Sequence, residues 1–310
     1  MALPQIAGIR SFDNRDLEAS DRISRHIHRG GLAVLEGSWD RILRLRQTLR
    51  AKGADPTALR LLALRAGDVS LSAVPGLWAL AKDGYVLLED ALFALNAPLQ
   101  HVDALGAAVT TIHPDVLVPR SQPLIHLLRR ALEQVRPELP AAPAVLDMGC
   151  GSGVCSLLAA RVMPEAMVTA TDHLPEAVAS TAVNAGRLGM TIKTARPGDL
   201  YETLGDQQFD LMIFNAPWVA APARNRMETA LNDGGQQTIR RFLAGAPAHL
   251  NPGGRVIVGY ADHSGPKAIA NLERFIEESG LKTAERLSDR IRTHRSKQAW
   301  ESIYAYIIGR

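Results

Sequence analysis

A short run of residues has the types and spacing of a nucleotide-binding turn. Three glycines alternate with other residues directly after an acid, in the order Asp147, Gly149, Gly151 and Gly153. Glycine lets the backbone turn sharply and lie against a ligand, where a Cβ would clash. A helix that begins at Gly153 would direct its unpaired N–H groups at the same place. The run therefore predicts a strand, a tight turn and a helix N-terminus, which together open a βαβ unit that binds a nucleotide.

A second acidic residue lies at the end of the next apolar segment. Residues 167–171 have the composition of a buried strand, and Asp172 follows them directly. A carboxylate at this distance from a glycine-rich turn accepts hydrogen bonds from the ribose hydroxyls of a bound nucleotide. The turn alone is a weak signal, but the turn and Asp172 together predict a ligand that contains ribose.

The order of these residues resembles a known superfamily. With an acid at its first position, the pattern Asp-x-Gly-x-Gly-x-Gly is more similar to class I S-adenosylmethionine (SAM) methyltransferases than to NAD dehydrogenases. The resemblance implies that Asp147 helps to hold the methionine end of SAM through water or backbone contacts. It also implies that Asp199 accepts a hydrogen bond from the adenine amine, while Leu200 donates its backbone N–H to the ring. The expected cofactor site comprises Arg120, Asp147, Gly149, Cys150, Gly151, Gly153, Asp172, His173, Asp199, Leu200 and Asn215, with no metal ion.

A second motif carries the expected chemistry. The buried strand at 209–214 brings Asn215 to the carboxyl edge of the sheet, where ligands of α/β proteins bind. The run Asn215-Ala216-Pro217-Trp218 resembles the Asn-Pro-Pro-aromatic motif of amino methyltransferases. This implies that the Asn215 side chain and the Ala216 carbonyl accept hydrogen bonds from the target nitrogen, and that Trp218 stacks on the planar acceptor. Ala216 keeps the carbonyl of the usual proline but loses the ring that makes the turn rigid.

Two further segments resemble the release factor glutamine methyltransferases. One is Val-Leu-Val-Pro-Arg at 116–120, and the other is the Asp-Gly-Gly run at 233–235, which also occurs in the "methyltransferase small domain" group. The resemblance covers about residues 115–310. It places Arg120 beside the carboxylate of SAM, although a surface position after a proline fits the sequence nearly as well.

Strands and helices alternate from residue 144 onward, which predicts a parallel sheet with right-handed crossovers. With an antiparallel hairpin at its end, this α/β sheet resembles the seven-stranded, mostly parallel sheet of the Rossmann-like class I methyltransferase fold. We expect this SAM-binding domain to span residues 115–310. The expected strands cover 144–148, 167–171, 191–195, 209–214, 254–260, 283–288 and 302–308, and the expected helices cover 122–135, 153–162, 175–188, 235–249 and 266–279.

Residues 1–114 are expected to form a separate, mainly helical domain. Helices are predicted at 21–29, 39–50 and 57–66, and strand-like segments at 85–88 and 92–95. Three helices and a small hairpin would suit a winged-helix-like module, which binds DNA in some proteins and covers an active site in others. The arginines of 39–50 are better explained as the solvated face of an amphipathic helix than as a nucleic-acid surface.

Composition excludes several classes of protein. The chain has 310 residues, of which 46% are hydrophobic, and a formal net charge of +3. No apolar run is long enough to span a bilayer, and the two cysteines, Cys150 and Cys155, are too few for a disulfide framework. We therefore expect a cytoplasmic protein without a membrane partner. The modest charge makes a nucleic-acid partner unnecessary without excluding it.

The sequence thus predicts transfer of a methyl group from SAM to a nitrogen atom, with S-adenosylhomocysteine as the second product. The helical reading of residues 1–114, with their small hairpin, and the modest charge favour a small-molecule acceptor over a protein glutamine or a ribosomal RNA base. In an alternative reaction SAM is itself the substrate and cyclises, releasing methylthioadenosine and a cyclic amino acid of the azetidine-2-carboxylate type. A DNA-binding module with a SAM-sensing domain is disfavoured by the absence of a strongly basic helix. The sequence leaves the oligomeric state open.

Overall fold

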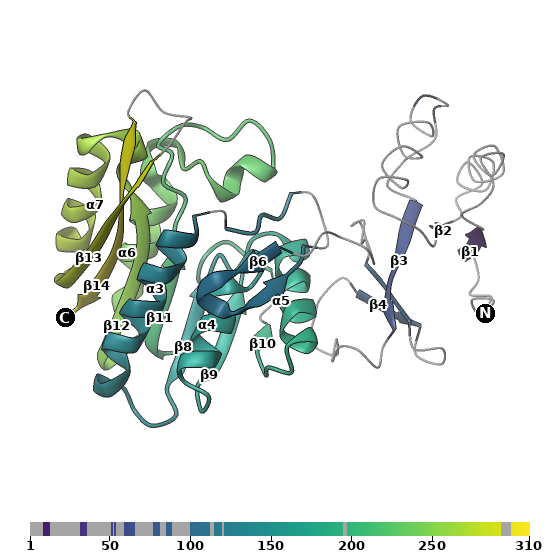
Figure 1. The fold of residues 1–310 in the computed structure, drawn as a ribbon, viewed down its shortest axis with the longest axis horizontal. Coiled ribbons are helices and arrows are strands. Elements are labelled where there is room, and N and C mark those ends of the chain that lie inside the picture. Colours follow the sequence, from purple (N-terminus) through teal and green to yellow (C-terminus); the bar gives the residue numbers. More distant parts are fainter. Residues whose placement is uncertain are drawn as a thin grey trace.

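The computed structural model describes residues 100–111, 115–119, 121–194, 197–292 and 299–310. Within residues 1–99 it describes the backbone of five short strands, together with residues 51 and 53. Figure 1 shows the larger described region as a twisted sheet with helices on both of its faces. None of the helices in the described residues is long and apolar enough to cross a membrane.

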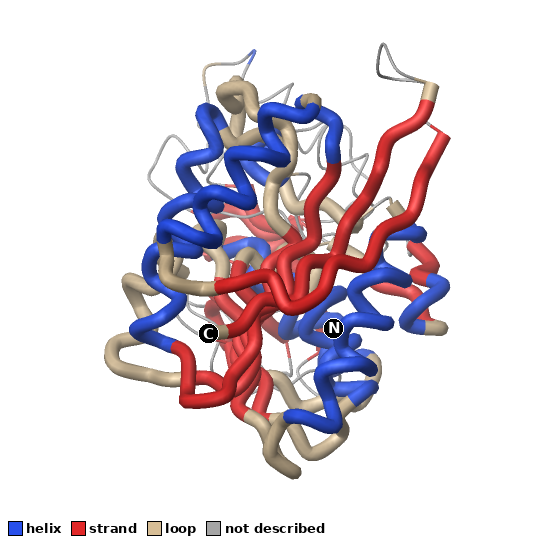
Figure 2. The backbone as a smooth tube through the Cα atoms, turned by 90° about the vertical axis from the view of Figure 1, so that its left-hand side faces the viewer, coloured by secondary structure: helices blue, strands red, loops and turns tan. Residues whose placement is uncertain are grey.

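The central sheet has seven strands in the order β10-β9-β8-β11-β12-β14-β13. Strand β14 pairs antiparallel with both of its neighbours, and the other pairings are parallel. Figure 2 shows β13 and β14 as a long hairpin that extends past the other strands. The strands are β8 (Ala144–Met148), β9 (Met167–Thr171), β10 (Lys193–Thr194), β11 (Phe209–Asn215), β12 (Leu250–Ala261), β13 (Lys282–Arg292) and β14 (Trp300–Gly309).

Helices cover both faces because side chains alternate along each buried strand. On β11, Leu211 and Ile213 join the hydrophobic cluster beneath α3 and α4, whereas Met212 and Phe214 join the cluster beneath α6 and α7. Asn215 follows in the same alternation and therefore belongs to the α3 face. The helices are α3 (Gln122–Val135), α4 (Val154–Val162), α5 (Pro175–Arg187), α6 (Gln237–His249) and α7 (Pro266–Glu278).

The chain reverses its direction of strand addition between β8 and β11. From β8 the sheet grows through β9 to β10, and it then resumes on the other side of β8 with β11 and β12. The carboxyl ends of β8 and β11 are therefore neighbours without a crossover helix between them. Such a switch point leaves a crevice that forms the usual ligand site of an open α/β sheet.

The predicted Rossmann-like sheet and its terminal antiparallel hairpin are confirmed. All seven expected strands are present, and α3, α4, α5, α6 and α7 start or end within two residues of the predicted bounds. The largest differences are at β12 and β13, which begin or end several residues beyond the apolar runs that predicted them. Backbone pairing continues into polar residues there, and hydrophobicity does not mark it.

Residues 102–109 pack against the main sheet's helices. The short strands β6 (Gln100–Val102) and β7 (Ala107–Val109) flank the 3₁₀ turn η3 (Asp103–Leu105). Val102, Leu105 and Val109 are buried in the same cluster as α3 and α4. The division of the chain at residue 114 stays a prediction.

The described strands of residues 1–99 form a sheet in the order β1-β2-β3-β5-β4. The predicted helix at 57–66 is wrong, because β3 occupies most of it and pairs with both β2 and β5. A leucine-rich run fits either a helix or a buried strand, and pairing with neighbours decides between them. The predicted strand at 85–88 is confirmed as β5, while the segments 21–29, 39–50 and 92–95 lie outside the described residues. The strands are β1 (Ile9–Phe12), β2 (Leu32–Leu35), β3 (Leu59–Arg65), β4 (Leu77–Leu80) and β5 (Tyr85–Leu88).

Candidate active site

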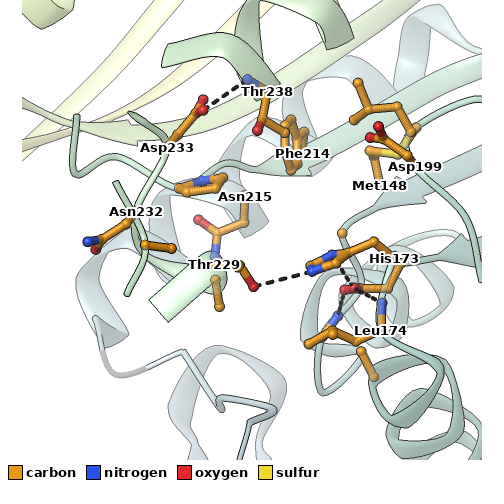
Figure 3. Close-up of a pocket in the computed structure, with 18 of the residues that line it drawn as sticks. Met148, His173, Leu174, Asp199, Phe214, Asn215, Thr229, Asn232, Asp233 and Thr238 are labelled. Carbon is orange, nitrogen blue, oxygen red and sulfur yellow. Dashed lines mark hydrogen bonds and ion pairs between the residues drawn. The ribbon is translucent and has the colours of Figure 1, made fainter. Parts of the chain in front are cut away.

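A cavity of about 560 Å³ opens at the carboxyl ends of β8, β9 and β11, at the switch point of the sheet. Figure 3 shows side chains from several loops directed into it, with Asn215 between the Asn232–Asp233 side and the His173–Leu174 side. Eight of the residues predicted from sequence line this cavity: Gly149, Gly151, Asp172, His173, Asp199, Leu200, Asn215 and Pro217.

The glycine turn after β8 needs glycine for two separate reasons. Gly149, Gly151 and Gly153 have φ values of 65°, 53° and 83°, a left-handed region that favours glycine. A Cβ on Gly149 would lie 3.0 Å from the Phe214 ring, and one on Gly153 would lie 2.9 Å from the Thr181 side chain. The turn therefore brings the backbone against the cavity at Gly149 and against α5 at Gly153.

Cys150 lies inside the turn and does not line the cavity. Its backbone N–H donates to the Thr171 carbonyl at 2.9 Å, which ties the turn to the end of β9. Burial raises the pKa of its thiol well above the usual value, so the sulfur is a neutral, inert group at ordinary pH. Its role at the cofactor stays a prediction.

We expect Gly153→Ala to destabilise the fold. The substitution combines a left-handed backbone with a contact of 3.0 Å to the Thr181 Cα, which cannot move as a flexible side chain can. Left-handed strain costs about 1–2 kcal/mol and overpacking a further 1–3 kcal/mol or so. Gly189→Ala is the matched control, because Gly189 has φ of 64° and nothing within 4 Å of its Cβ position. Urea unfolding that gives both variants equal losses would contradict this account.

Asp172 is buried and organises the loop after β9. Its Oδ2 accepts the Gly151 N–H at 3.0 Å, and its Oδ1 accepts the Leu174 N–H at 2.9 Å. The Nδ1 of His173 lies 3.0 Å from Oδ1, and this hydrogen bond raises the pKa of His173 above its ordinary value. The carboxylate therefore joins the glycine turn, the start of α5 and a histidine at one point of the cavity wall.

Asp199 and Leu200 form another part of the wall. Leu200 has φ of 53°, an uncommon value for a residue with a side chain. The Asp199 carboxylate lies 2.8 Å from the Arg241 guanidinium, and both side chains are more than half exposed. Arg241 also lines the cavity and was not predicted as a site residue. No sequence signal connects it with Asp199, because it comes from α6.

Asn215 occupies the last position of β11, opposite Gly259 of β12. A Cβ on Gly259 would lie only 3.0 Å from the Asn215 Oδ1, so glycine makes the room that the amide occupies. Among the described residues nothing hydrogen-bonds the Asn215 side chain, and it lines the cavity. The Ala216 N–H donates to the Gly259 carbonyl at 3.2 Å, a bond that proline could not form. Ala216 itself is buried and does not line the cavity.

Trp218 is half-buried and packs against both hydrophobic clusters of the sheet. It is not among the residues that line the cavity, although Pro217 is. The predicted stacking of its indole on an acceptor stays a prediction. The packing shows a second role that the motif did not indicate, because Trp218 fills the space where the two clusters meet.

Asp147 faces the helix that follows the turn. It is buried, and its Oδ2 accepts the Ser156 N–H at 2.8 Å and the Ser156 hydroxyl at 2.5 Å. It does not line the cavity, so its predicted contact with SAM stays a prediction. Burial raises its pKa to about 7, although the two bonds from Ser156 act in the opposite direction. Arg120 lies outside the described residues.

We expect Asp147 to make stability depend on pH. Its pKa is about 7 in the folded protein against an ordinary value of 3.8, so between about pH 4 and pH 7 the folded state holds a proton that the unfolded state has lost. The free energy of unfolding should therefore fall as the pH rises through this window. Asp147→Asn should remove this part of the fall, as measured by urea unfolding across the window. Equal slopes for wild type and Asp147→Asn would refute it, and Asp289→Asn, at an exposed site, controls for charge alone.

A segment of residues 223–231, which we call the strap, crosses beside the cavity. The guanidinium of Arg226 binds the buried Glu176 carboxylate at 2.9 Å and lies 3.6 Å from Asp115. The Thr229 hydroxyl lies 3.2 Å from the His173 Nε2, the dashed contact in Figure 3. The strap is thus fastened to α5 and to the loop after β9. Sequence reasoning missed these three contacts, since their partners are far apart in the chain.

The Asp-Gly-Gly run fastens the loop after Asn215 to α6. The Asp233 carboxylate accepts the N–H groups of Thr238 and Ile239 at 2.9 and 3.0 Å, so it caps the helix. The Asp233 N–H donates to the Val219 carbonyl, and the Val219 N–H donates to the Leu231 carbonyl. Asn232, Asp233 and Gly234 line the cavity. The described part of the chain contains no group of three or more metal-ligating side chains.

The sheet order and the glycine turn that faces a cavity at the switch point define a class I SAM-dependent methyltransferase. Within this class the chain belongs to the methyltransferase small domain family, whose model matches residues 126–285. SAM is the methyl donor of class I methyltransferases of this family. The turn fits such a ligand, because Gly149 and Gly151 bring backbone without side chains to a cavity that Asp172 and Asp199 also line.

Curated relatives match about half of the chain or less. A release factor glutamine methyltransferase of Geobacter sulfurreducens is 35% identical over 47% of this chain and 54% of its own. A Bordetella pertussis protein of the same name is 36% identical over 54% of this chain and 64% of its own. A ribosomal protein uL3 glutamine methyltransferase of Bradyrhizobium diazoefficiens is 40% identical over 38% of this chain and 40% of its own. The chain therefore spans only part of the length of the relatives it matches.

These relatives correct one expectation. A small-molecule partner was predicted from the modest net charge and the helical reading of the N-terminal residues. The matched relatives carry names that place the acceptor in a protein, which contradicts that prediction. Net charge reports on electrostatic attraction to a partner, and it does not distinguish a protein surface from a small ligand.

Proposed function

We propose that this protein transfers the methyl group of SAM to the side-chain amide nitrogen of a glutamine residue in another protein. The observation that carries the proposal is the Asn215 amide at the cavity wall, without a hydrogen-bond partner among the described residues. The relatives named as glutamine methyltransferases support the same acceptor. The cavity at the switch point of the sheet supports SAM as the cofactor, because open α/β sheets bind nucleotides at this place.

The residues of the turn and of two loops would hold SAM. The left-handed glycines Gly149 and Gly151 would place backbone groups against it, and Asp172 would accept hydrogen bonds from the ribose. The Asp199 carboxylate would accept a hydrogen bond from the adenine amine, and Arg241 would hold this carboxylate in place. When bound, SAM supplies a methyl group on a positively charged sulfur for in-line transfer and leaves as S-adenosylhomocysteine.

The loop after β11 would position the acceptor. An amide nitrogen is a weak nucleophile, because its lone pair is delocalised onto the carbonyl. We infer that the Asn215 Oδ1 and the Ala216 carbonyl accept its two N–H groups, which fixes the direction of the lone pair. The same two oxygens stabilise the positive charge that develops on the nitrogen before it releases a proton to water. Pro217 and Trp218 would cover the planar face of the amide.

The test is a methylation assay with defined acceptors. The purified protein is incubated with isotopically labelled SAM and, in separate reactions, with a bacterial release factor or ribosomal protein uL3. We expect mass spectrometry to locate one methyl group on a glutamine of one of these proteins. S-adenosylhomocysteine should accumulate only when the acceptor protein is present.

Two other products would overturn the proposal. Methylthioadenosine in a reaction without an acceptor would show that SAM itself is the substrate. Label in ribosomal RNA, together with unlabelled release factor and uL3, would show a nucleic-acid acceptor.

A further inference from the structure

A single hydroxyl holds the backbone of the loop that follows Asn215. The Ser264 Oγ donates to the Trp218 carbonyl at 3.2 Å and accepts the Ala220 N–H at 2.8 Å. Both bonds fall on the residues directly around Val219. Ser264 belongs to the 3₁₀ turn η7 (Asp262–Ser264), which follows β12 at the carboxyl edge of the sheet. It does not line the cavity.

The turn η7 is itself fixed to β14. The Asp262 Oδ1 accepts the Ser302 N–H at 2.8 Å, and the His263 Nδ1 lies 2.5 Å from the buried Glu301 carboxylate. Two side chains on successive residues therefore anchor the turn to the neighbouring strand. As a result, the Ser264 hydroxyl has a defined place relative to the sheet.

The opposite side of the loop is fixed by a different segment. The Val219 N–H donates to the Leu231 carbonyl at 2.9 Å, and the Val219 carbonyl accepts the Asp233 N–H at 2.8 Å. Val219 is thus held by Leu231 and Asp233 on one side, while its two neighbours are held by Ser264 on the other. Hydrogen bonds from two different segments therefore fix the backbone between Trp218 and Ala220, the last part of the loop that begins at Ala216.

The replacement of the usual proline gives this support its importance. Proline restricts φ at its own position, and Ala216 lacks that restriction. The Ala216 N–H is held by the Gly259 carbonyl, and Pro217 restricts the ψ angle of Ala216, so a shift of the Ala216 carbonyl has to come from the residues after Pro217. Hydrogen bonds that fix Trp218 and Ala220 limit such a shift. A displacement of about 1 Å at a reacting centre can slow a reaction 100-fold.

We propose that Ser264 is a positioning residue for methyl transfer, which fixes the acceptor-binding loop through Trp218 and Ala220. This proposal rests on the proposed function, in which Asn215 and the Ala216 carbonyl hold the target amide. Ser264 acts through the loop and touches neither SAM nor the acceptor. Its loss should therefore lower kcat while the affinity for SAM is preserved.

The test compares Ser264→Ala and Ser264→Thr with wild type. Two neutral hydrogen bonds are lost in the alanine variant, so kcat should fall about tenfold. The Kd for SAM, measured by calorimetry, should change less than about twofold, and threonine should restore most of kcat because it keeps the hydroxyl. Ser279→Ala is the matched control, since the Ser279 hydroxyl also donates to a backbone carbonyl, at the end of α7. Its kcat should equal that of wild type.

A second readout does not depend on activity. Hydrogen exchange at the Ala220 amide should become faster in Ser264→Ala and stay unchanged in Ser279→Ala. An unchanged kcat in Ser264→Ala, a threonine variant as slow as alanine, or unchanged exchange at Ala220 would each overturn the positioning role. The wild-type reaction separates the two proposals. If wild type methylates no glutamine, the proposed function fails, and the exchange measurement still decides whether Ser264 holds the loop.

Discussion

Replacing Asn215 by alanine is expected to lower kcat for glutamine methylation by about 10²–10³-fold, the usual loss when a well-placed polar group is removed from a reacting centre. The variant should fold normally, because the amide makes no hydrogen bond among the described residues and its site beside Gly259 is roomy enough for a smaller side chain. Steady-state kinetics with the acceptor protein provide the measurement. The Kd for SAM should change less than about tenfold, since the lost interaction is made chiefly with the acceptor.

Two further variants separate position from chemistry at Asn215. Asn215→Gln keeps the amide but moves its oxygen by one bond, and we expect kcat to stay at least about tenfold below wild type. Asn251→Ala removes an amide that donates to Asp210 at 2.8 Å near the other end of β11, and its kcat should be unaffected. An Asn215→Ala enzyme as active as Asn251→Ala would show that the loop does not align the acceptor through this side chain.

The parts of the site that could be predicted are those with a local physical cause. Glycine at 149 and 153 is required by left-handed backbone within the turn itself, so the spacing of the glycines was sufficient. Asp172 directly follows a strand, and the carboxyl ends of parallel strands lie at the edge of the sheet where ligands bind. Asn215 was located by the same argument. These residues needed no knowledge of their distant neighbours.

The parts that could not be predicted depend on partners far away in the chain. The guanidinium of Arg226 reaches the buried Glu176, and that of Arg241 reaches Asp199, yet neither pair has a spacing that a motif could reveal. The Ser264 hydroxyl meets Trp218 only because β11 and β12 are adjacent in the sheet. Such contacts follow from tertiary structure, which sequence periodicity does not encode.

The helix predicted at 57–66 shows a different limit. Leucines and arginines in this run have a high intrinsic helix propensity. The run nevertheless forms β3, because backbone pairing with β2 and β5 satisfies its N–H and C=O groups in an extended form. Propensity is a weak prior, and a pairing partner on each side overrides it.

Asp172 has less free capacity for a ligand than its position first indicates. A carboxylate has about four lone-pair sites, and three of them already face Gly151, Leu174 and His173. One site is therefore free, and two ribose hydroxyls can both bind only if one of the three present hydrogen bonds is broken. The backbone N–H groups are fixed by the turn and by α5, whereas the half-exposed His173 ring is held only by two side chains, those of Asp172 and Thr229. If Asp172 holds both ribose hydroxyls, as proposed, we expect the His173 ring to give up its hydrogen bond to this carboxylate when SAM binds.

We expect Asp172→Asn to weaken SAM binding about 10–150-fold, because charge-assisted hydrogen bonds are worth about 1.5–3 kcal/mol. Asparagine keeps the shape of the side chain and one acceptor oxygen, so the turn can still be held from one side. Calorimetric titration with SAM measures the change. A parallel titration uses a SAM analogue that lacks the 2′-hydroxyl. Wild type should bind this analogue more weakly than SAM, and Asp172→Asn should bind the two ligands nearly alike.

The control for this prediction is Asp210→Asn. The Asp210 Oδ2 also accepts a backbone N–H, that of Ala144 at 2.8 Å, at the amino edge of the sheet and away from the cavity. Its substitution therefore removes a carboxylate of similar structural role without touching the ligand site. Asp210→Asn should bind SAM as wild type does, even if its melting temperature falls. If Asp172→Asn loses affinity equally for SAM and for the analogue, its carboxylate supports the glycine turn and does not hold the ribose.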